Sequence, residues 1–282
     1  MLMTPRYDGP AVLRIDVPLA DPSVPLVRQR RRLADVLALL DDDQWAAASR
    51  CEQWSVQDVI SHLIGTNQFW AASIASGVAG KPTRYLTSFD PVTTPALLVA
   101  GMRDMEPSGV LAQYVETSDA LAGVVAGLDD VGWSMPAEAP IGHMAVRAVV
   151  LHALWDAWIH ERDIVVPLGL PTVIEDDEVA ACLLYATALG PAIVATNGSA
   201  REGRLTVRAT DPDVSFVLDI GPTVVVRAGS AAEIDGSPCL TGDAVSLIEA
   251  LGFRAPLDYG LDDDDRWLLG GLGDAFDVSL RS

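Results

Sequence analysis

Residues 51–63 read CEQWSVQDVISHL and predict the beginning of a long helix. Ser55 can cap the first turn, and Asp58 three residues later can return the hydrogen bond as a capping box. The apolar residues that follow recur at helical spacing: Val56, Val59, Ile60 and Leu63. His62 is therefore expected about two turns into this helix.

Further helices are predicted on both sides of this stretch from the same spacing of apolar residues. They cover residues 24–40, 108–128, 144–165 and 176–189. A Pro- and Thr-rich loop over 81–95 separates the early helices. The RQRRR run inside the first of them is interpreted as a solvated helix face rather than as an anion site.

Period-two alternation marks the last third of the chain. Residues 204–209, 214–218 and 223–227 are predicted strands joined by tight turns, and two closing helices follow over 244–251 and 265–272. The fold class is therefore α+β: an up-down four-helix bundle followed by a smaller α+β domain. The expected divisions are an N-terminal extension over 1–23, the bundle over 24–172, and the second domain over 173–282.

Composition excludes several classes of function. The chain has 282 residues, 50% of them hydrophobic, and 19 basic against 39 acidic residues give a net charge of −20. Such an acidic surface repels nucleic acid and anionic membranes. The apolar stretch over 179–196 contains Gly and Pro and is predicted as a buried helix rather than a membrane span. With no secretory signal at the N-terminus, the protein is expected to be cytoplasmic.

Motif and cysteine patterns narrow the chemistry further. Three widely spaced cysteines form no disulfide or C-x-x-C framework, which indicates free thiols in a reducing compartment. The G-x-G-x-x-G, Walker A, G-x-S-x-G and H-E-x-x-H motifs are all absent from the sequence.

The histidines are few and suggest a metal site. Asp156 and His160 are i and i+4 on one predicted helix, so a carboxylate and an imidazole share a face. His152 lies on the same side but about 12 Å from His160 along the axis, so only one of these two histidines can join Asp156 on an ion. A third ligand must come from another helix, where His62 is the candidate histidine. A simple Asp–His salt bridge is the structural alternative.

Two stretches resemble the signatures of a known family. Residues 51–63, and GHM at 142–144 followed by DAWIHERDI at 156–164, are similar to the signatures of the mycothiol-dependent maleylpyruvate isomerase family, within the DinB-like four-helix bundles. The two stretches occur in the same order as in that family. A looser resemblance over 242–254 extends to its smaller C-terminal domain.

The resemblance implies a set of site residues. In that family a divalent metal, usually zinc, is held by two His and one Glu, and these positions correspond to His62, His160 and Asp156. Asp in place of Glu is a departure, because its side chain is one methylene shorter. The family's catalytic arginine corresponds to Arg254, while Asp163 and His152 are expected to surround the ligands without binding the ion.

The resemblance also implies a reaction. Three protein ligands leave one position open, where mycothiol as co-substrate could bind as the thiolate. The thiolate would add to an electrophilic alkene or displace a leaving group, and Arg254 would pair with an anionic substrate. The expected function is a metal-dependent, thiol-using isomerase or S-transferase, acting as a monomer or homodimer on a small molecule.

Two alternatives stay open. Water in the open position would make a metal-dependent hydrolase or tailoring enzyme, with Glu161 or His152 as the base. A non-catalytic module that binds a metal or ligand is the other.

Overall fold

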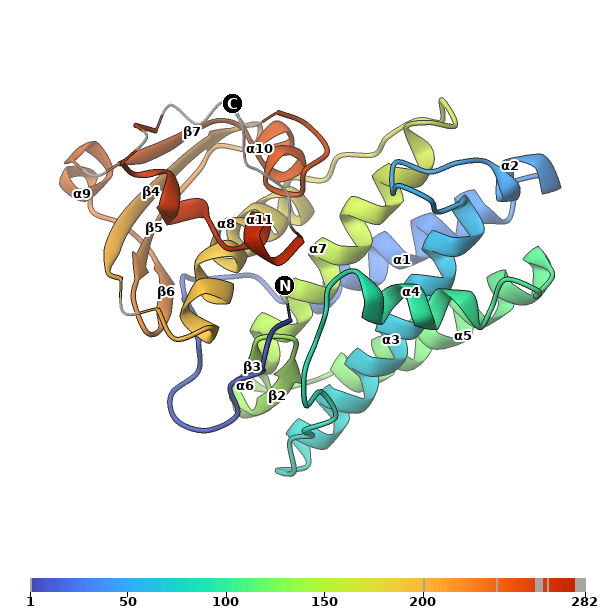
Figure 1. Cartoon of the computed structure of the whole chain (residues 1–282), viewed down its shortest axis with the longest axis horizontal. Helices are drawn as coiled ribbons and strands as arrows, with labels where there is room; N and C mark the ends of the chain where they lie inside the picture. Colours follow the sequence, from blue (N-terminus) through green and yellow to red (C-terminus); the bar gives the residue numbers. More distant parts are fainter. Residues whose placement is uncertain (1, 200, 237, 257–260, 263, 277–282) are drawn as a thin grey trace.

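Four long helices form one half of the molecule in the computed structural model, which describes residues 2–199, 201–236, 238–256, 261–262 and 264–276 (Figure 1). They are α1 (Ser23–Leu37), α3 (Val56–Val78), α5 (Pro107–Val125) and α7 (Val146–Val165). Helices α1 and α3 each pack against both α5 and α7, so α1 and α3 lie diagonally across the bundle. This half, followed by a mixed sheet, confirms the predicted fold class.

Shorter elements connect the bundle helices. They are α2 (Asp42–Ala46), α4 (Thr93–Ala100), α6 (Asp130–Ser134) and a hairpin of β2 (Pro136–Ala139) and β3 (Gly142–Ala145). Helix α4 was not expected from the sequence, because it is short and leaves Leu97 and Leu98 exposed. The Asp90 carboxylate defines its start by accepting hydrogen bonds from the backbone N–H groups of Val92 and Thr93.

The other half of the molecule is a five-stranded sheet in the order β1-β6-β5-β4-β7 (Figure 1). The three predicted strands are β4 (Gly203–Thr210), β5 (Val214–Ile220) and β6 (Val224–Arg227), and β7 (Cys239–Asp243) pairs in parallel with β4. The edge strand β1 (Leu13–Asp16) comes from the N-terminal segment and pairs in parallel with β6. Within the segment over 1–23 that was predicted as an extension, residues 13–16 are therefore part of the sheet.

Helix α8 (Asp176–Thr196) runs about two turns beyond its predicted end at residue 189. The helix passes through Gly190 and Pro191, although proline lacks an N–H and its ring crowds the preceding turn. Gly190 allows residues 269–270 to pack closely on the helix, since a Cβ at this position would lie 2.7 Å from the Leu269 carbonyl oxygen. Among the described helices α8 alone is long and apolar enough to span a membrane, yet 83% of its most apolar window is buried inside the protein.

The remaining helices of this half are α9 (Ala231–Gly236), α10 (Ala244–Leu251), a 3-10 turn (Arg266–Leu269) and α11 (Leu272–Phe276). Helix α10 has its predicted bounds. The predicted helix over 265–272 is instead divided in two, because Gly271 has a φ of +102° that no helix can contain.

The arginine run of α1 corrects one interpretation. Arg30 is only 3% exposed and donates to Asn67 Oδ1 and to the backbone oxygen of Ala153. Arg32 pairs with Glu161 on α7 and Glu178 on α8. These residues attach α1 to its neighbours, so the prediction of a solvated face was wrong for them.

Candidate metal centre

The capping box at the start of α3 forms as the sequence predicts and sets the position of His62. Ser55 Oγ accepts a hydrogen bond from the backbone N–H of Asp58, and the Asp58 carboxylate accepts one from the N–H of Ser55. The preceding residue Trp54 lies over the site, with its ring centroid 5.4 Å from that of His62 and 6.5 Å from that of His160. His62 is thereby held in the second turn, facing α7.

His62, Asp156 and His160 form a cluster between α3 and α7. His62 Nε2 lies 3.5 Å from Asp156 Oδ1, and His160 Nε2 lies 3.6 Å from the same oxygen. All the potential ligand atoms lie within 4.8 Å of one another. Ligands about 2.0–2.1 Å from a tetrahedral zinc ion are about 3.3 Å apart, so the observed separations suit one ion. Asp156 Oδ1 is therefore close to both histidines although the Asp side chain is one methylene shorter than Glu.

The cluster is buried and keeps ligand atoms without protein partners. His62 and His160 are each 8% exposed. Burial would raise the pKa of Asp156, but the neighbouring imidazoles outweigh it and hold that pKa well below its usual range. Asp156 Oδ2 and His62 Nδ1 are buried without a hydrogen-bond partner. Two imidazoles and one carboxylate, of which one oxygen is unsatisfied, form a donor set that suits a divalent metal ion.

Asp163 connects this cluster to the other half of the molecule. Its Oδ2 accepts a hydrogen bond from His160 Nδ1 at 2.9 Å, so the proton of that ring is on Nδ1 and the Nε2 lone pair faces Asp156. Arg254, which follows α10, donates from Nε to Oδ1 at 3.0 Å and from Nη2 to Oδ2 at 2.6 Å. Arg50 donates to Oδ1 as well, at 3.2 Å. Asp163 is fully buried and orients His160 while it holds two arginines.

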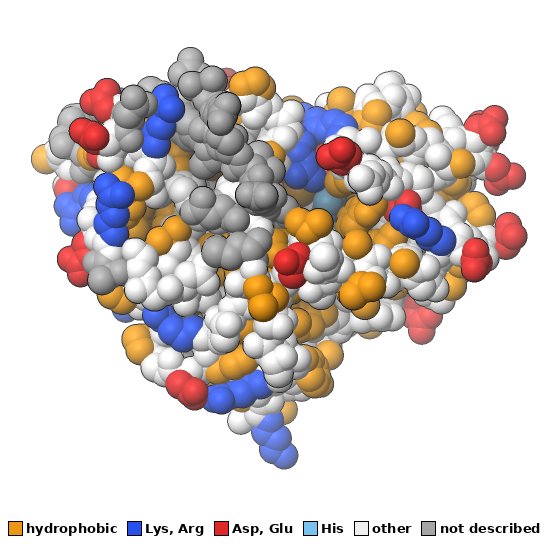
Figure 2. Space-filling model, viewed as in Figure 1, with side chains coloured by type: hydrophobic (Ala, Val, Ile, Leu, Met, Phe, Trp, Pro, Cys, Tyr) orange, Lys and Arg blue, Asp and Glu red, His pale blue; other side chains and the backbone are white. Residues whose placement is uncertain are grey.

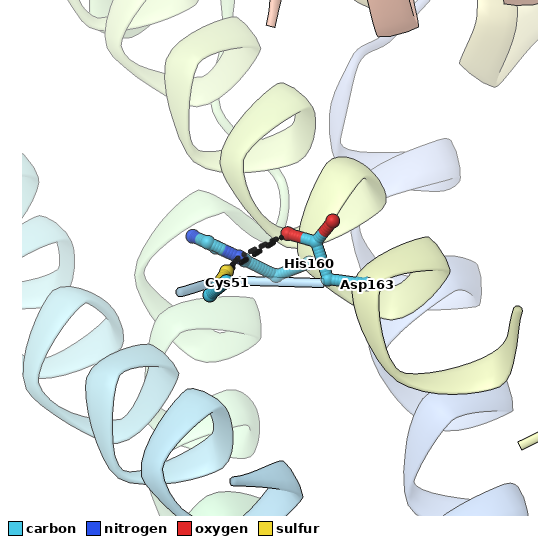
Figure 3. Close-up of side chains that lie close together, drawn as sticks. All are labelled: Cys51, His160 and Asp163. Carbon is cyan, nitrogen blue, oxygen red and sulfur yellow. Dashed lines mark hydrogen bonds and ion pairs between the residues drawn. The ribbon is translucent and has the colours of Figure 1, made fainter. Parts of the chain in front are cut away.

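A second group of possible ligands lies on the opposite edge of the His160 ring. Figure 3 shows Cys51, His160 and Asp163, with Cys51 Sγ 3.1 Å from Asp163 Oδ2. Burial, aided by the Asp163 carboxylate, raises the pKa of Cys51 to about 12, so the thiol keeps its proton. The Arg254 guanidinium already balances the negative charge of Asp163 here, and its Nη2 lies 3.4 Å from the Cys51 sulfur. The Nε2 edge of His160 is therefore the better candidate for binding a cation than this edge.

Several predicted site residues have other partners. Arg254 lies beside the cluster, but its fork is bound to Asp163, so a bidentate contact with a substrate carboxylate would compete with that ion pair. His152 is hydrogen-bonded to Tyr185 at 2.6 Å and lies outside the cluster. Glu161 is bound by Arg32 and Gln29, so it does not face the cluster as a base would.

Arg50, Cys51 and Trp54 were not predicted as site residues. Cys51 and Trp54 lie within the quoted motif, so the sequence held a signal for these two. The structure adds strained backbone beside the site: Gln53 and Phe253, which directly precede Trp54 and Arg254, have φ values of 65° and 62°. Such left-handed conformations in residues other than glycine are costly and collect at functional sites.

Histidine atoms are visible in a hollow of the surface between the two halves, beside arginine side chains (Figure 2). These arginines are local cations on a protein of net charge −20.

Substitution of Asp156 tests whether it is a ligand. Asp156→Ala is expected to lower metal affinity by more than about 100-fold, since even residues around the ligands contribute about 10–100-fold. Asp156→Glu is expected to keep the metal, and His152→Ala serves as the control that also keeps it. Metal content per chain by elemental analysis is the measurement. Loss of the ion in His152→Ala with retention in Asp156→Ala would contradict the assignment.

Comparison with known proteins gives a consistent family and fold. Residues 26–165 match the family described as the mycothiol maleylpyruvate isomerase N-terminal domain. Two solved structures of a mycothiol-dependent maleylpyruvate isomerase, one of a histidine-to-alanine mutant, superpose with TM-scores of 0.57 and 0.56 at 14% identity. Each comparison covers 85% of this chain and 90% of the other, so the likeness in fold includes the sheet.

A further solved structure is YfiT from Bacillus subtilis, described as a probable metal-dependent hydrolase with an unusual four-helix bundle topology. It matches with a TM-score of 0.42 and 16% identity, over 53% of this chain and 87% of that one. The curated proteins contain no sequence that matches this chain.

Proposed function

The chain belongs, through residues 26–165, to the mycothiol maleylpyruvate isomerase N-terminal domain family, and on that premise we propose that it is a metal-dependent, thiol-using isomerase or S-transferase. The observation that carries the proposal is the buried cluster of His62, Asp156 and His160, with its unpartnered carboxylate oxygen. Zinc is the ion that two imidazoles and a carboxylate suit well. When bound, it offers an open position and lowers the pKa of a thiol there, which supplies a thiolate nucleophile at neutral pH.

The protein's own residues prepare the site for this chemistry. Asp163 fixes the tautomer of His160, so that Nε2 is free to act as a ligand. His160 and Arg254 keep Asp163 ionised, and Arg50 helps to hold it in place. Trp54 covers the two imidazole rings and limits the access of water to them.

The substrate proposed is a small electrophile that carries a negative charge. Arg254 and Arg50 lie beside the cluster, and they are local cations in a chain of net charge −20. Arg254 has two roles in this proposal. It positions His160 by holding Asp163, and it binds a substrate carboxylate through the N–H groups that are not already donated to Asp163 and to the Gly252 carbonyl.

Cobalt substitution tests the thiol. In protein loaded with Co²⁺, mycothiol is expected to produce a thiolate-to-cobalt charge-transfer band, and isomerisation of maleylpyruvate, or conjugation of another electrophile, should require the thiol. Buffer without thiol is the control. Absence of the band together with turnover in thiol-free buffer would contradict the proposal and favour water as the reacting group.

A further inference from the structure

His152 and Tyr185 form a buried pair beside the metal cluster. His152 precedes Asp156 by four residues on α7, so the two side chains share a face about 6 Å apart along the axis. The Tyr185 hydroxyl, from α8, lies 2.6 Å from His152 Nδ1. The imidazole also packs on Trp70 of α3, with ring centroids 4.7 Å apart. Three helices thus hold this ring one turn from a proposed ligand.

The pair fixes where the imidazole proton lies. Tyr185 is fully buried, and burial raises its pKa well above the usual range, so the hydroxyl keeps its proton. Among the described residues the hydroxyl has no partner other than His152 Nδ1. The buried O–H is therefore satisfied only if it donates to Nδ1, which places the ring proton on Nε2. Burial also lowers the pKa of His152 to about 4, so the ring is neutral at pH 7.

Two buried donors without an acceptor lie on rings that contact His152. The Nε2–H of His152 is bonded to none of the described residues and is not buried as they are, since the residue is 9% exposed, so it is available to a ligand. The indole Nε1–H groups of Trp70 and Trp155 are buried without partners, and both rings contact the His152 ring. Buried donors without partners are costly and rare. A group of donors alone, with no net charge, is satisfied by a ligand that presents acceptor oxygens.

We propose that the His152–Tyr185 pair is a further binding element of the site, at which His152 Nε2–H donates a hydrogen bond to a carbonyl oxygen of the substrate. This inference rests on the proposed function. When a thiolate adds to an alkene conjugated with that carbonyl, a carbon–sulfur bond forms and the π electrons move to the carbonyl oxygen. The neutral N–H stabilises the resulting negative charge without giving up its proton. Elimination then breaks the carbon–sulfur bond and returns the electron pair to the alkene.

Nitrogen-15 NMR of the zinc-loaded protein tests the tautomer of His152. The chain has four histidines, so the imidazole resonances are few enough to assign. His152, assigned by comparison with His152→Gln, is expected to carry its proton on Nε2 and to leave Nδ1 bare at neutral pH. Pyruvate, as a probe with a carbonyl and a carboxylate, is expected to shift the Nε2–H resonance. A proton on Nδ1, an imidazolium ring, or no response to pyruvate would each overturn the inference.

Turnover of a matched pair of phenol variants gives the second readout. Tyr185→Phe removes the donor to Nδ1 and is expected to lower kcat by about 10- to 100-fold with metal content unchanged, less than the effect of a direct oxyanion donor. Tyr114→Phe is the control, since Tyr114 is equally buried in the bundle but has an unpartnered hydroxyl. Equal kcat values for the two variants would overturn the inference. If the native protein shows no thiol-dependent turnover, the proposed function is contradicted and the kcat comparison cannot be made. The NMR result then decides the inference about His152 by itself.

Discussion

His160→Asn is expected to leave the protein folded and without its metal. The asparagine amide can occupy the place of Nδ1 and still donate to Asp163, which His160 contacts at 2.9 Å. It removes Nε2, which lies 3.6 Å from Asp156 Oδ1 in the cluster. Metal affinity should fall by more than about 100-fold, since a direct ligand contributes more than a residue behind it. Thiol-dependent turnover should be lost with the metal.

His62→Ala is expected to cause the same loss of metal affinity, because it removes the proposed ligand that α3 contributes. The control is His143→Gln, because His143 contacts the Thr83 carbonyl oxygen and lies outside the cluster. Elemental analysis and circular dichroism measure metal content and folding together. A folded His160→Asn protein that retains one ion per chain would exclude His160 as a ligand.

Asp163→Asn is expected to destabilise the fold by about 3–5 kcal/mol, the cost of removing one member of a buried ion pair. The carboxylate is fully buried and is bound by Arg254, Arg50 and His160. A neutral amide cannot balance the positive charge of two guanidinium groups. Its NH₂ group is also a donor, so it cannot accept the hydrogen bonds that these arginines donate. The free energy of unfolding from urea titration is the measurement. The variant should also lose metal affinity, by about 10–100-fold.

The pH dependence of this effect has a definite sign. Burial would raise the pKa of Asp163, but hydrogen bonds from His160 and Arg254 hold it well below its usual range. A carboxylate with a depressed folded-state pKa contributes stability above its unfolded pKa of about 4, and that stability is lost as the pH falls. The difference in unfolding free energy between native protein and Asp163→Asn should therefore shrink below about pH 4.

Asp219→Asn is the matched control for Asp163→Asn. Asp219 also accepts from two arginines, Arg204 and Arg227, but its side chain is 36% exposed at the surface of the sheet. Exposed ion pairs contribute about 0–1 kcal/mol, so this variant should change little. Equal losses of stability in the two variants would contradict the assignment of Asp163 as the buried connection between the halves.

The sequence alone determined the parts of the protein that depend on local pattern. The capping box of Ser55 and Asp58 predicted the start of α3 and hence the turn that carries His62. The i,i+4 spacing of Asp156 and His160 predicted that they share a face of α7, because helical geometry alone sets that relation. Period-two alternation likewise predicted β4, β5 and β6. Each of these features depends on residues within a few positions of one another.

Only the tertiary structure decided the contacts between distant segments. Arg254 and Cys51 meet Asp163 from positions 91 and 112 residues away, and β1 pairs with β6 across more than 200 residues. Residues 269–270 pack on Gly190 of α8 so closely that no side chain fits there. Local pattern gives no information on which segments pack together, since burial of apolar surface is not directional. Asp163, which orients His160, lies only three residues away on α7, but the arginines that hold this carboxylate come from distant segments.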